Sequence, residues 1–241
     1  MVRTVKFSIA AIVAAGALVA TSTSMAAASI ESTDRQSENA DGNDAYVVVD
    51  ITKATEASDG KIFYPTGNID SDTLVVIPDN GGTLGGIPVE EVTAILDAGG
   101  TEALDKALVE SQKLEIHGSL SNYLQDVIVP SAANMSFAAP PMGYSPIIEH
   151  TTARIGGPGS QVHYGFTVTA GSNQHACATG RGYYEGYNGS EMGVWSKMYG
   201  IGCAGGGNTS GASVPWGNVA SHPAFQARST TIHMAAGAWW F

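Results

Sequence analysis

Apolar and polar residues alternate with a period of two along much of the C-terminal part of the chain. The clearest case is VHYGFTVT, residues 162–169, where every second residue is large and apolar: Val162, Tyr164, Phe166 and Val168. Successive side chains of a strand point to opposite faces, so this alternation predicts a strand with one buried face. Similar segments separated by glycine-rich breaks predict further strands over residues 175–184, 192–203, 213–219 and 224–241. Such a series is typical of an antiparallel β-sandwich or small barrel, which we expect over residues 147–241.

The segment EGYNGSE, residues 185–191, separates two of these predicted strands. Asn188 and Gly189 tolerate positive φ angles, so the segment predicts the turn of a β-hairpin. Alternation should place one set of side chains of the second hairpin strand on a shared face with Cys203. Counted back by twos, that set is Ile201, Tyr199, Lys197 and Trp195.

The N-terminal half shows a different pattern, with two continuous apolar runs followed by helical spacing. AYVVVDI, residues 45–51, and TLVVIP, residues 73–78, predict buried strands. The segments that follow predict helices over residues 85–100, 101–113 and 120–129. The glycine pair Gly99-Gly100 should stop the first of these helices. We expect a small acidic α+β region over residues 45–128.

Charge and composition change near the middle of the chain. Residues 29–149 hold 20 acidic and 5 basic residues, whereas residues 150–241 hold 2 acidic and 4 basic ones. All four tryptophans and 18 of the 30 glycines also lie in the second part. We interpret this shift as two units joined by a proline- and alanine-rich linker or long crossover, residues 129–146, with the acidic unit as a pro-region or a regulatory partner. Residues 29–44 are polar and acidic, which predicts a disordered segment.

The first 28 residues have the pattern of a bacterial secretory signal peptide. Arg3 and Lys6 precede an apolar run of 14 residues, Phe7 to Ala20, and small residues follow. The run is shorter than the roughly 20 apolar residues that a membrane-spanning helix needs. We therefore expect cleavage after Ala26 or Ala28, and a secreted, extracellular or cell-wall associated protein with no transmembrane segment after cleavage.

That compartment decides how the two cysteines are interpreted. Cys177 and Cys203 fall on the two predicted strands of the hairpin, around a segment rich in glycine and tyrosine. Oxidising surroundings favour a disulfide between two lone cysteines over a catalytic thiol. We therefore expect a bridge from Cys177 to Cys203, which would tie together two strands of a small domain.

Aromatic residues are the strongest candidates for a binding function. The predicted β-domain has more of them than one small core needs, and exposed tyrosine and tryptophan suit stacking on sugars or burial in a protein interface. Neighbours on a strand face opposite sides, so one member each of Tyr183-Tyr184 and Trp239-Trp240 should lie outside the core. We expect the binding residues to be Tyr183, Tyr187, Trp195, Tyr199, Trp216 and Trp239.

Together these features predict a non-enzymatic secreted protein that binds an extracellular glycan or protein surface. One alternative is a small extracellular hydrolase that uses Glu185 or Glu191 with a histidine. Another is an outer-membrane β-barrel, because the chain ends in Phe241 after two tryptophans. The histidines lack metal-ligand spacing, and nucleophile and phosphate-loop motifs are missing, so we expect no metal and no cofactor. Net acidity without a basic stripe argues against binding to nucleic acid.

Overall fold

The computed structural model describes residues 45–119, 134–171 and 173–241, with the backbone alone from 112 to 119. Within these ranges the protein is mainly β, and its C-terminal part consists of antiparallel sheets, as the alternation predicts. The expected signal peptide, the acidic segment 29–44 and the helix expected over 120–129 lie outside the described residues. No helix of the described part is long and apolar enough to cross a membrane.

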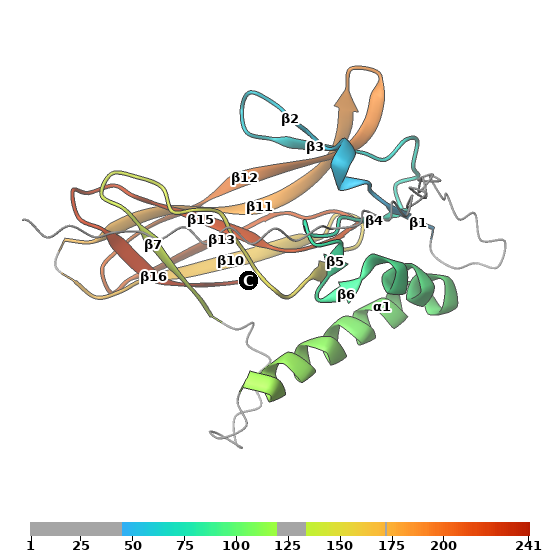
Figure 1. The fold of residues 1–241 in the computed structure, drawn as a ribbon. Helices are drawn as coiled ribbons and strands as arrows, with labels where there is room; N and C mark the ends of the chain where they lie inside the picture. The colour runs from blue at the N-terminus through green and yellow to red at the C-terminus, as the bar shows by residue number, and fades with distance from the viewer. Residues whose placement is uncertain (1–44, 120–133, 172) are drawn as a thin grey trace, which may run out of the picture. The chain divides into compact units, whose positions relative to one another are not determined.

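The elements follow one another in this order (Figure 1): β1 (Tyr46–Val48), the 3-10 helix η1 (Ile51–Lys53), β2 (Thr55–Glu56), β3 (Ile62–Pro65), β4 (Leu74–Val76), β5 (Thr83–Leu84), β6 (Ile87–Pro88), α1 (Val89–Ser119), β7 (Met135–Ala139), β8 (Ile148–Glu149), β9 (Arg154–Ile155), β10 (Gln161–Val168), β11 (His175–Asn188), β12 (Glu191–Gly205), β13 (Thr209–Pro215), β14 (Val219–Ser221), β15 (Ala224–Ser229) and β16 (Ala235–Trp240).

Three sheets hold most of these strands. A six-stranded sheet has the order β2-β3-β12-β11-β15-β8, and a four-stranded sheet has the order β13-β10-β16-β7. A second four-stranded sheet, β1-β4-β14-β9, contains both strands predicted from the apolar runs of the N-terminal half. In this sheet β1 and β14 run parallel to β4, whose three residues are all buried. Parallel strands buried on both faces read as continuous apolar runs, which explains the sequence pattern there.

The strands β11 and β12 form a long hairpin that carries the predicted disulfide. Cys177 and Cys203 are direct partners across the two strands, and they form the bridge that the sequence predicts. Asn188 pairs with Glu191 at the other end of the hairpin, so the turn is the two-residue loop after Asn188. Gly189 begins this loop with a φ of +66°, a conformation that glycine adopts without strain.

A β-bulge interrupts the hairpin next to the disulfide. The register shifts between Ala178 and Thr179, and Ile201 is left without a partner on β11. Ile201 is buried whereas Cys203 is exposed, so the expectation that these two side chains share a face is wrong. The extra residue in the bulge reverses the alternation of side chains at this point. Counting every second residue from Cys203 therefore assigns Ile201 to the wrong face.

The main core lies between the six-stranded sheet and the sheet β13-β10-β16-β7. The side chains that alternate along β10 are all buried in it, as predicted: Val162, Tyr164, Phe166 and Val168. A Cβ on Gly180 of β11 would come within 2.6 Å of the Tyr164 ring, so the glycine allows this close approach of the two sheets. The rings of Phe225 and Trp239 stack in the same core, with centroids 5.1 Å apart.

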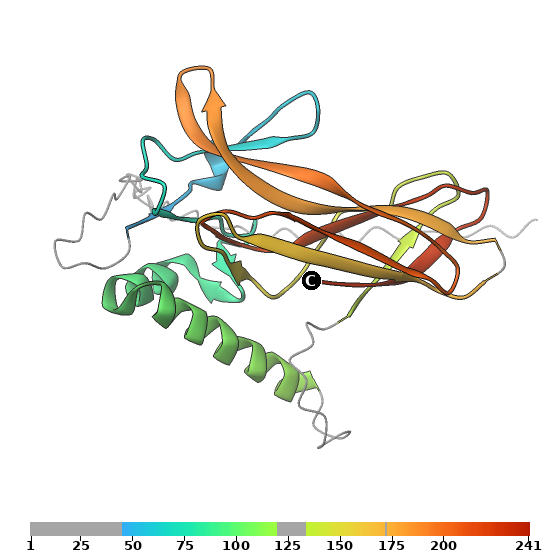
Figure 2. The same cartoon turned by 180° about the vertical axis from the view of Figure 1, so that it is seen from behind.

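A second, smaller core lies beneath α1. Leu96, Leu104 and Leu108 of the helix are buried in one cluster with residues of β4 and of the short β5–β6 hairpin. Gly100 interrupts the helical backbone with a φ of +64°, so the two helices predicted on either side of the glycine pair are confirmed, in one kinked element. Figure 2, which views the protein from behind, shows α1 next to the β5–β6 hairpin.

Strands from the N-terminal half share sheets with strands from the C-terminal half. β3 pairs with β12, and β4 pairs with β14. Residues 135–139, inside the expected linker, form the edge strand β7 and pair with β16. Within the described residues, the segment 129–146 thus contains an edge strand of the sheet that includes β10 and β16. Long-range strand pairing leaves no signal in local composition, so the change in charge could not predict that strands of the two parts share sheets.

Candidate functional site

Half of the aromatic residues expected to bind a ligand are buried in the core. The Trp216 indole is fully buried, and its Nε1–H donates to the carbonyl of Val219 at 2.8 Å. The ring of Tyr183 meets Trp216 edge-on, and its hydroxyl donates to Ser221 Oγ at 2.9 Å. Trp239 is likewise fully buried. These three side chains have structural partners in the core, and Tyr183 and Trp216 also form part of the wall of a shallow cavity.

The rule that neighbouring aromatic residues face opposite sides is confirmed. Tyr183 is 1% exposed and Tyr184 is 37% exposed. Trp239 is buried in the main core, while the half-buried Trp240 lies against Gly165 of the adjacent strand β10. Alternation therefore predicted that each pair would split, and the packing of the sheets decided which member is buried.

Three of the remaining rings lie on one face of the β11–β12 hairpin, which we call the aromatic face: Tyr184, Trp195 and Tyr199. Tyr184 and Trp195 are direct cross-strand partners, and Tyr199 lies further along β12 on the same side. Phe63 of β3 is the partner of Trp195 on its other side, with ring centroids 5.0 Å apart. The aromatic face is thus built across three strands, with Phe63 as its buried support.

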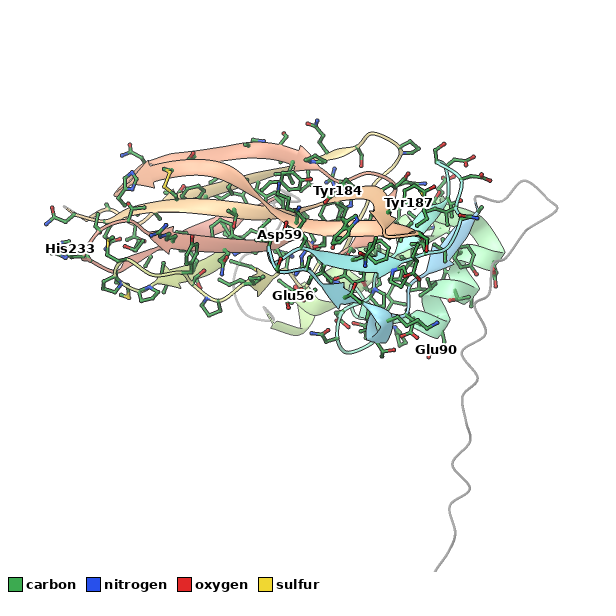
Figure 3. All side chains as sticks on the ribbon, turned by 90° about the horizontal axis from the view of Figure 1, so that it is seen from above. Glu56, Asp59, Glu90, Tyr184, Tyr187 and His233 are labelled. Carbon is green, nitrogen blue, oxygen red and sulfur yellow. A yellow bond between two sulfur atoms is a disulfide. The ribbon has the colours of Figure 1, made fainter. Side chains whose placement is uncertain are left out.

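Tyr187 is the most exposed of the expected binding residues, at 65%. It lies three residues after Tyr184 on β11, near the turn (Figure 3), so alternation directs its side chain to the opposite face of the hairpin. Its backbone carbonyl accepts a hydrogen bond from Trp195 Nε1 at 3.4 Å. This bond holds the indole of Trp195 in place on the aromatic face.

Basic side chains flank the aromatic face. The Lys197 ammonium lies 5.1 Å from the centroid of the Tyr199 ring, within the range of a cation–π interaction. Lys61 pairs with Asp59 at 2.6 Å, and this hydrogen bond raises the pKa of the lysine. Partial burial raises the pKa of Tyr199, so its hydroxyl stays neutral and can donate a hydrogen bond.

A shallow cavity of about 210 Å³ adjoins Tyr184, but its other hairpin residues, Tyr183, Glu185 and Val194, belong to the face opposite the aromatic face. Its walls are formed by Val75, Tyr183, Tyr184, Glu185, Val194, Trp216, Gly217, Asn218 and Val219. β15 pairs with β11 only as far as Gly180, so the cavity adjoins the part of β11 beyond that pairing. The exposed carboxylate of Glu185 is the charged group on its wall.

A second, more polar cavity of about 140 Å³ contains residues that the sequence analysis did not single out. Arg181 Nη1 pairs with Glu149 Oε1 at 2.6 Å, with the guanidinium largely buried and the carboxylate partly exposed. Burial disfavours the charge of Arg181, but Tyr183 and Glu149 outweigh this effect and raise its pKa. Burial raises the pKa of Tyr64, on the same wall, to about 12. The sequence feature that could have predicted this polar cluster is Arg181, a single charged residue within the strand predicted over residues 175–184.

The polar groups of this cavity hold neighbouring loops. His222 Nε2 accepts the backbone N–H of Gly85 at 3.0 Å, which links the connection between β14 and β15 to the β5–β6 turn. Asp79 accepts the N–H groups of Gly81 and Thr83 at 2.9 and 2.8 Å, and also the Thr83 hydroxyl. Glu185 and His222 line different cavities. The glutamate that shares the polar cavity with His222 is Glu149, and the hydrolase alternative named Glu185 or Glu191.

We expect the stability of the protein to fall as the pH drops below about 6.5. Burial lowers the pKa of His222 from its ordinary value of 6.5, although Asp79 and Glu149 oppose the shift and Arg181 and His150 add to it. The unfolded chain therefore takes up a proton before the folded one does. The stabilising effect of neutral His222 is present above the ordinary pKa and is lost as the pH falls through the lowered value.

Urea unfolding of the wild type and of His222→Gln between about pH 7 and pH 5 measures this effect. Glutamine can still accept the Gly85 N–H through its side-chain oxygen but does not titrate. We expect the variant to show a flatter pH dependence than the wild type. Parallel curves would contradict the assignment to His222.

Among the described residues, no group of three or more His, Cys, Asp and Glu side chains is arranged to hold a metal ion. Searches of protein families, of curated proteins and of solved structures found no match to this chain. Function must therefore be inferred from the two cavities and the aromatic face.

Proposed function

We propose that the protein acts outside the cell as a non-enzymatic binding protein, and that its ligand is a glycan held on the aromatic face. The disulfide between Cys177 and Cys203 supports an oxidising, extracellular compartment. The observation that carries the proposal is the set of partly exposed rings on one face of the hairpin: Tyr184, Trp195 and Tyr199. Flat rings offer a rigid apolar surface with polar edges, which suits stacking on a sugar ring.

The surroundings of the aromatic face favour a glycan over a protein surface. Recognition of a sugar needs hydrogen-bonding groups beside the stacking ring, because its hydroxyl groups lose water on binding. Lys61 and Lys197 supply donors near the rings, whereas the Glu185 carboxylate lies on the opposite face of β11 and lines the cavity that adjoins Tyr184. The rings are also held before binding, since Trp195 packs on Phe63, and pre-ordered side chains lose little entropy on binding.

The Tyr184→Ala variant tests this proposal. We expect roughly tenfold weaker binding to the glycan, because the change removes one of the three rings of the aromatic face. Isothermal titration with soluble peptidoglycan fragments and with chitin oligosaccharides measures the affinity. Tyr184 is partly exposed, so the variant should keep the fold, and a thermal melt checks this.

Tyr187→Ala is the matched control, because it removes an exposed tyrosine from the same strand but from the opposite face. We expect its affinity to equal that of the wild type. Equal losses in both variants would place the site elsewhere on the hairpin. If the wild-type protein bound none of these glycans, the proposed function would be wrong.

A further inference from the structure

Three large apolar side chains protrude at the opposite end of the β-strands from the hairpin turn. Ile232 is 78% exposed, Met142 is 55% exposed and Met234 is 54% exposed. They lie on the turn between β15 and β16 and on the turn that follows β7, and we call these three residues the apolar end. Figure 3 shows the neighbouring His233 at the opposite end of the strands from Tyr187, which lies near the hairpin turn. Exposed apolar side chains that gather in one place mark an interaction site.

Hydrogen bonds hold the turns of the apolar end together. The Met142 N–H donates to the carbonyl of Thr231 at 2.9 Å, and the Ser229 N–H donates to the carbonyl of Gly143 at 2.9 Å. The Thr231 hydroxyl donates to the carbonyl of Asn173 at 3.1 Å, which brings in a third turn. The apolar side chains are therefore presented by linked turns.

Met142 has an unusual backbone conformation that supports a functional role. Its φ is +53°, and it is the non-glycine residue with positive φ in the described part of the chain. A methionine in this region costs free energy that a glycine would not, and such strain persists where the surrounding structure fixes it. Here the bonded turn fixes a conformation in which the Met142 side chain stays exposed to solvent.

The segments around the apolar end contain no carboxylates. Residues 140–147, 170–177, 200–212 and 226–236 have no aspartate or glutamate, although the whole chain has a net charge of −11. The same segments contain Arg228, whose guanidinium lies 5.2 Å from the centroid of the Tyr144 ring. An exposed tyrosine beside an arginine is typical of the region where lipid headgroups meet acyl chains. This end of an acidic protein is thus free of the charges that an anionic surface would repel.

We propose that the apolar end docks on the surface of an anionic lipid bilayer. Ile232, Met142 and Met234 would enter the boundary between headgroups and acyl chains, and Arg228 would remain among the headgroup phosphates. Apolar side chains give such binding its strength, and a positive charge adds attraction to anionic lipid. This surface is separate from the aromatic face, so the protein could bind lipid whether or not it binds a glycan.

Flotation with vesicles tests the proposal on the full-length secreted chain. We expect the protein to float with phosphatidylcholine vesicles that contain phosphatidylglycerol, and to float less with phosphatidylcholine alone. The double variant Ile232→Ser, Met234→Ser should bind these vesicles about tenfold or more weakly than the wild type, because two apolar side chains that enter the bilayer would be lost. Both residues are exposed in the free protein, so a thermal melt should show little change.

Two control variants separate the possible explanations. Val109→Ser removes an exposed apolar side chain of α1, and Tyr184→Ala disrupts the aromatic face, so both should float like the wild type. Undiminished flotation of the double variant would overturn the proposal, as would equal binding to vesicles without phosphatidylglycerol. Self-association in the absence of lipid that the double variant abolishes would also overturn it, because a second copy would then cover the apolar end.

Discussion

Replacement of both cysteines, Cys177→Ser with Cys203→Ser, is expected to lower the free energy of unfolding by about 3–4 kcal/mol. The two residues are separated by 26 positions, so the bridge closes a sizeable loop in the unfolded chain and reduces its conformational entropy. Typical domains unfold with only about 5–15 kcal/mol, so this is a large share of the total. We expect an unfolding transition at clearly lower urea concentration.

Urea unfolding of the oxidised wild type, the reduced wild type and the double variant measures the effect. The reduced wild type should resemble the double variant, because both lack the bridge while keeping small side chains on the hairpin. A difference of less than about 0.5 kcal/mol between the oxidised wild type and the double variant would contradict the prediction. Cys177 and Cys203 would then be held in place by strand pairing alone.

The Trp239→Ala variant is expected to lose about 3–5 kcal/mol of stability. Trp239 is fully buried and stacks on Phe225 and Tyr164, so its removal leaves a cavity between two sheets. Surrounding strands are paired on both sides of β16 and can close this cavity only in part. Any effect of the variant on ligand binding should follow from unfolding.

Trp240→Ala is the matched control for this prediction. Trp240 is the next residue of β16 and is only half-buried, so its removal opens the surface of the sheet and leaves no enclosed cavity. We expect its cost, measured by urea unfolding, to be clearly smaller than that of Trp239→Ala. If both variants lost the same free energy of unfolding, the burial of the Trp239 indole would not make the expected contribution to the stability of the core.

These two predictions bear on the proposed function in different ways. The disulfide and Trp239 stabilise the β-strands that support the hairpin, whereas Tyr184 should affect affinity with little change in stability. Binding and unfolding measured on the same variants therefore distinguish a support residue from a contact residue. Trp239 and Tyr199 are alike in sequence, as aromatic residues on predicted strands, and only their burial separates them.

The predictions that held depend on neighbouring residues. Alternation along residues 162–169, the turn at Asn188-Gly189 and the break at Gly100 follow from local backbone preferences, which a short segment contains in full. The disulfide could also be predicted, because the chain has two cysteines and the hairpin register brings them opposite each other. The residues of the proposed aromatic face were recognised as strand residues for the same reason.

The sequence by itself therefore determined the strands, the hairpin and its bridge, since these depend on spacing along the chain. Only the tertiary structure decided which side of each strand is covered, because alternation defines two faces and does not say which one meets another sheet. The pairing of β3 with β12 buried Phe63 under Trp195, and the packing of the sheets buried Trp216 and Trp239. Contacts between residues far apart in the chain fix burial, and with it the surface left open to a ligand.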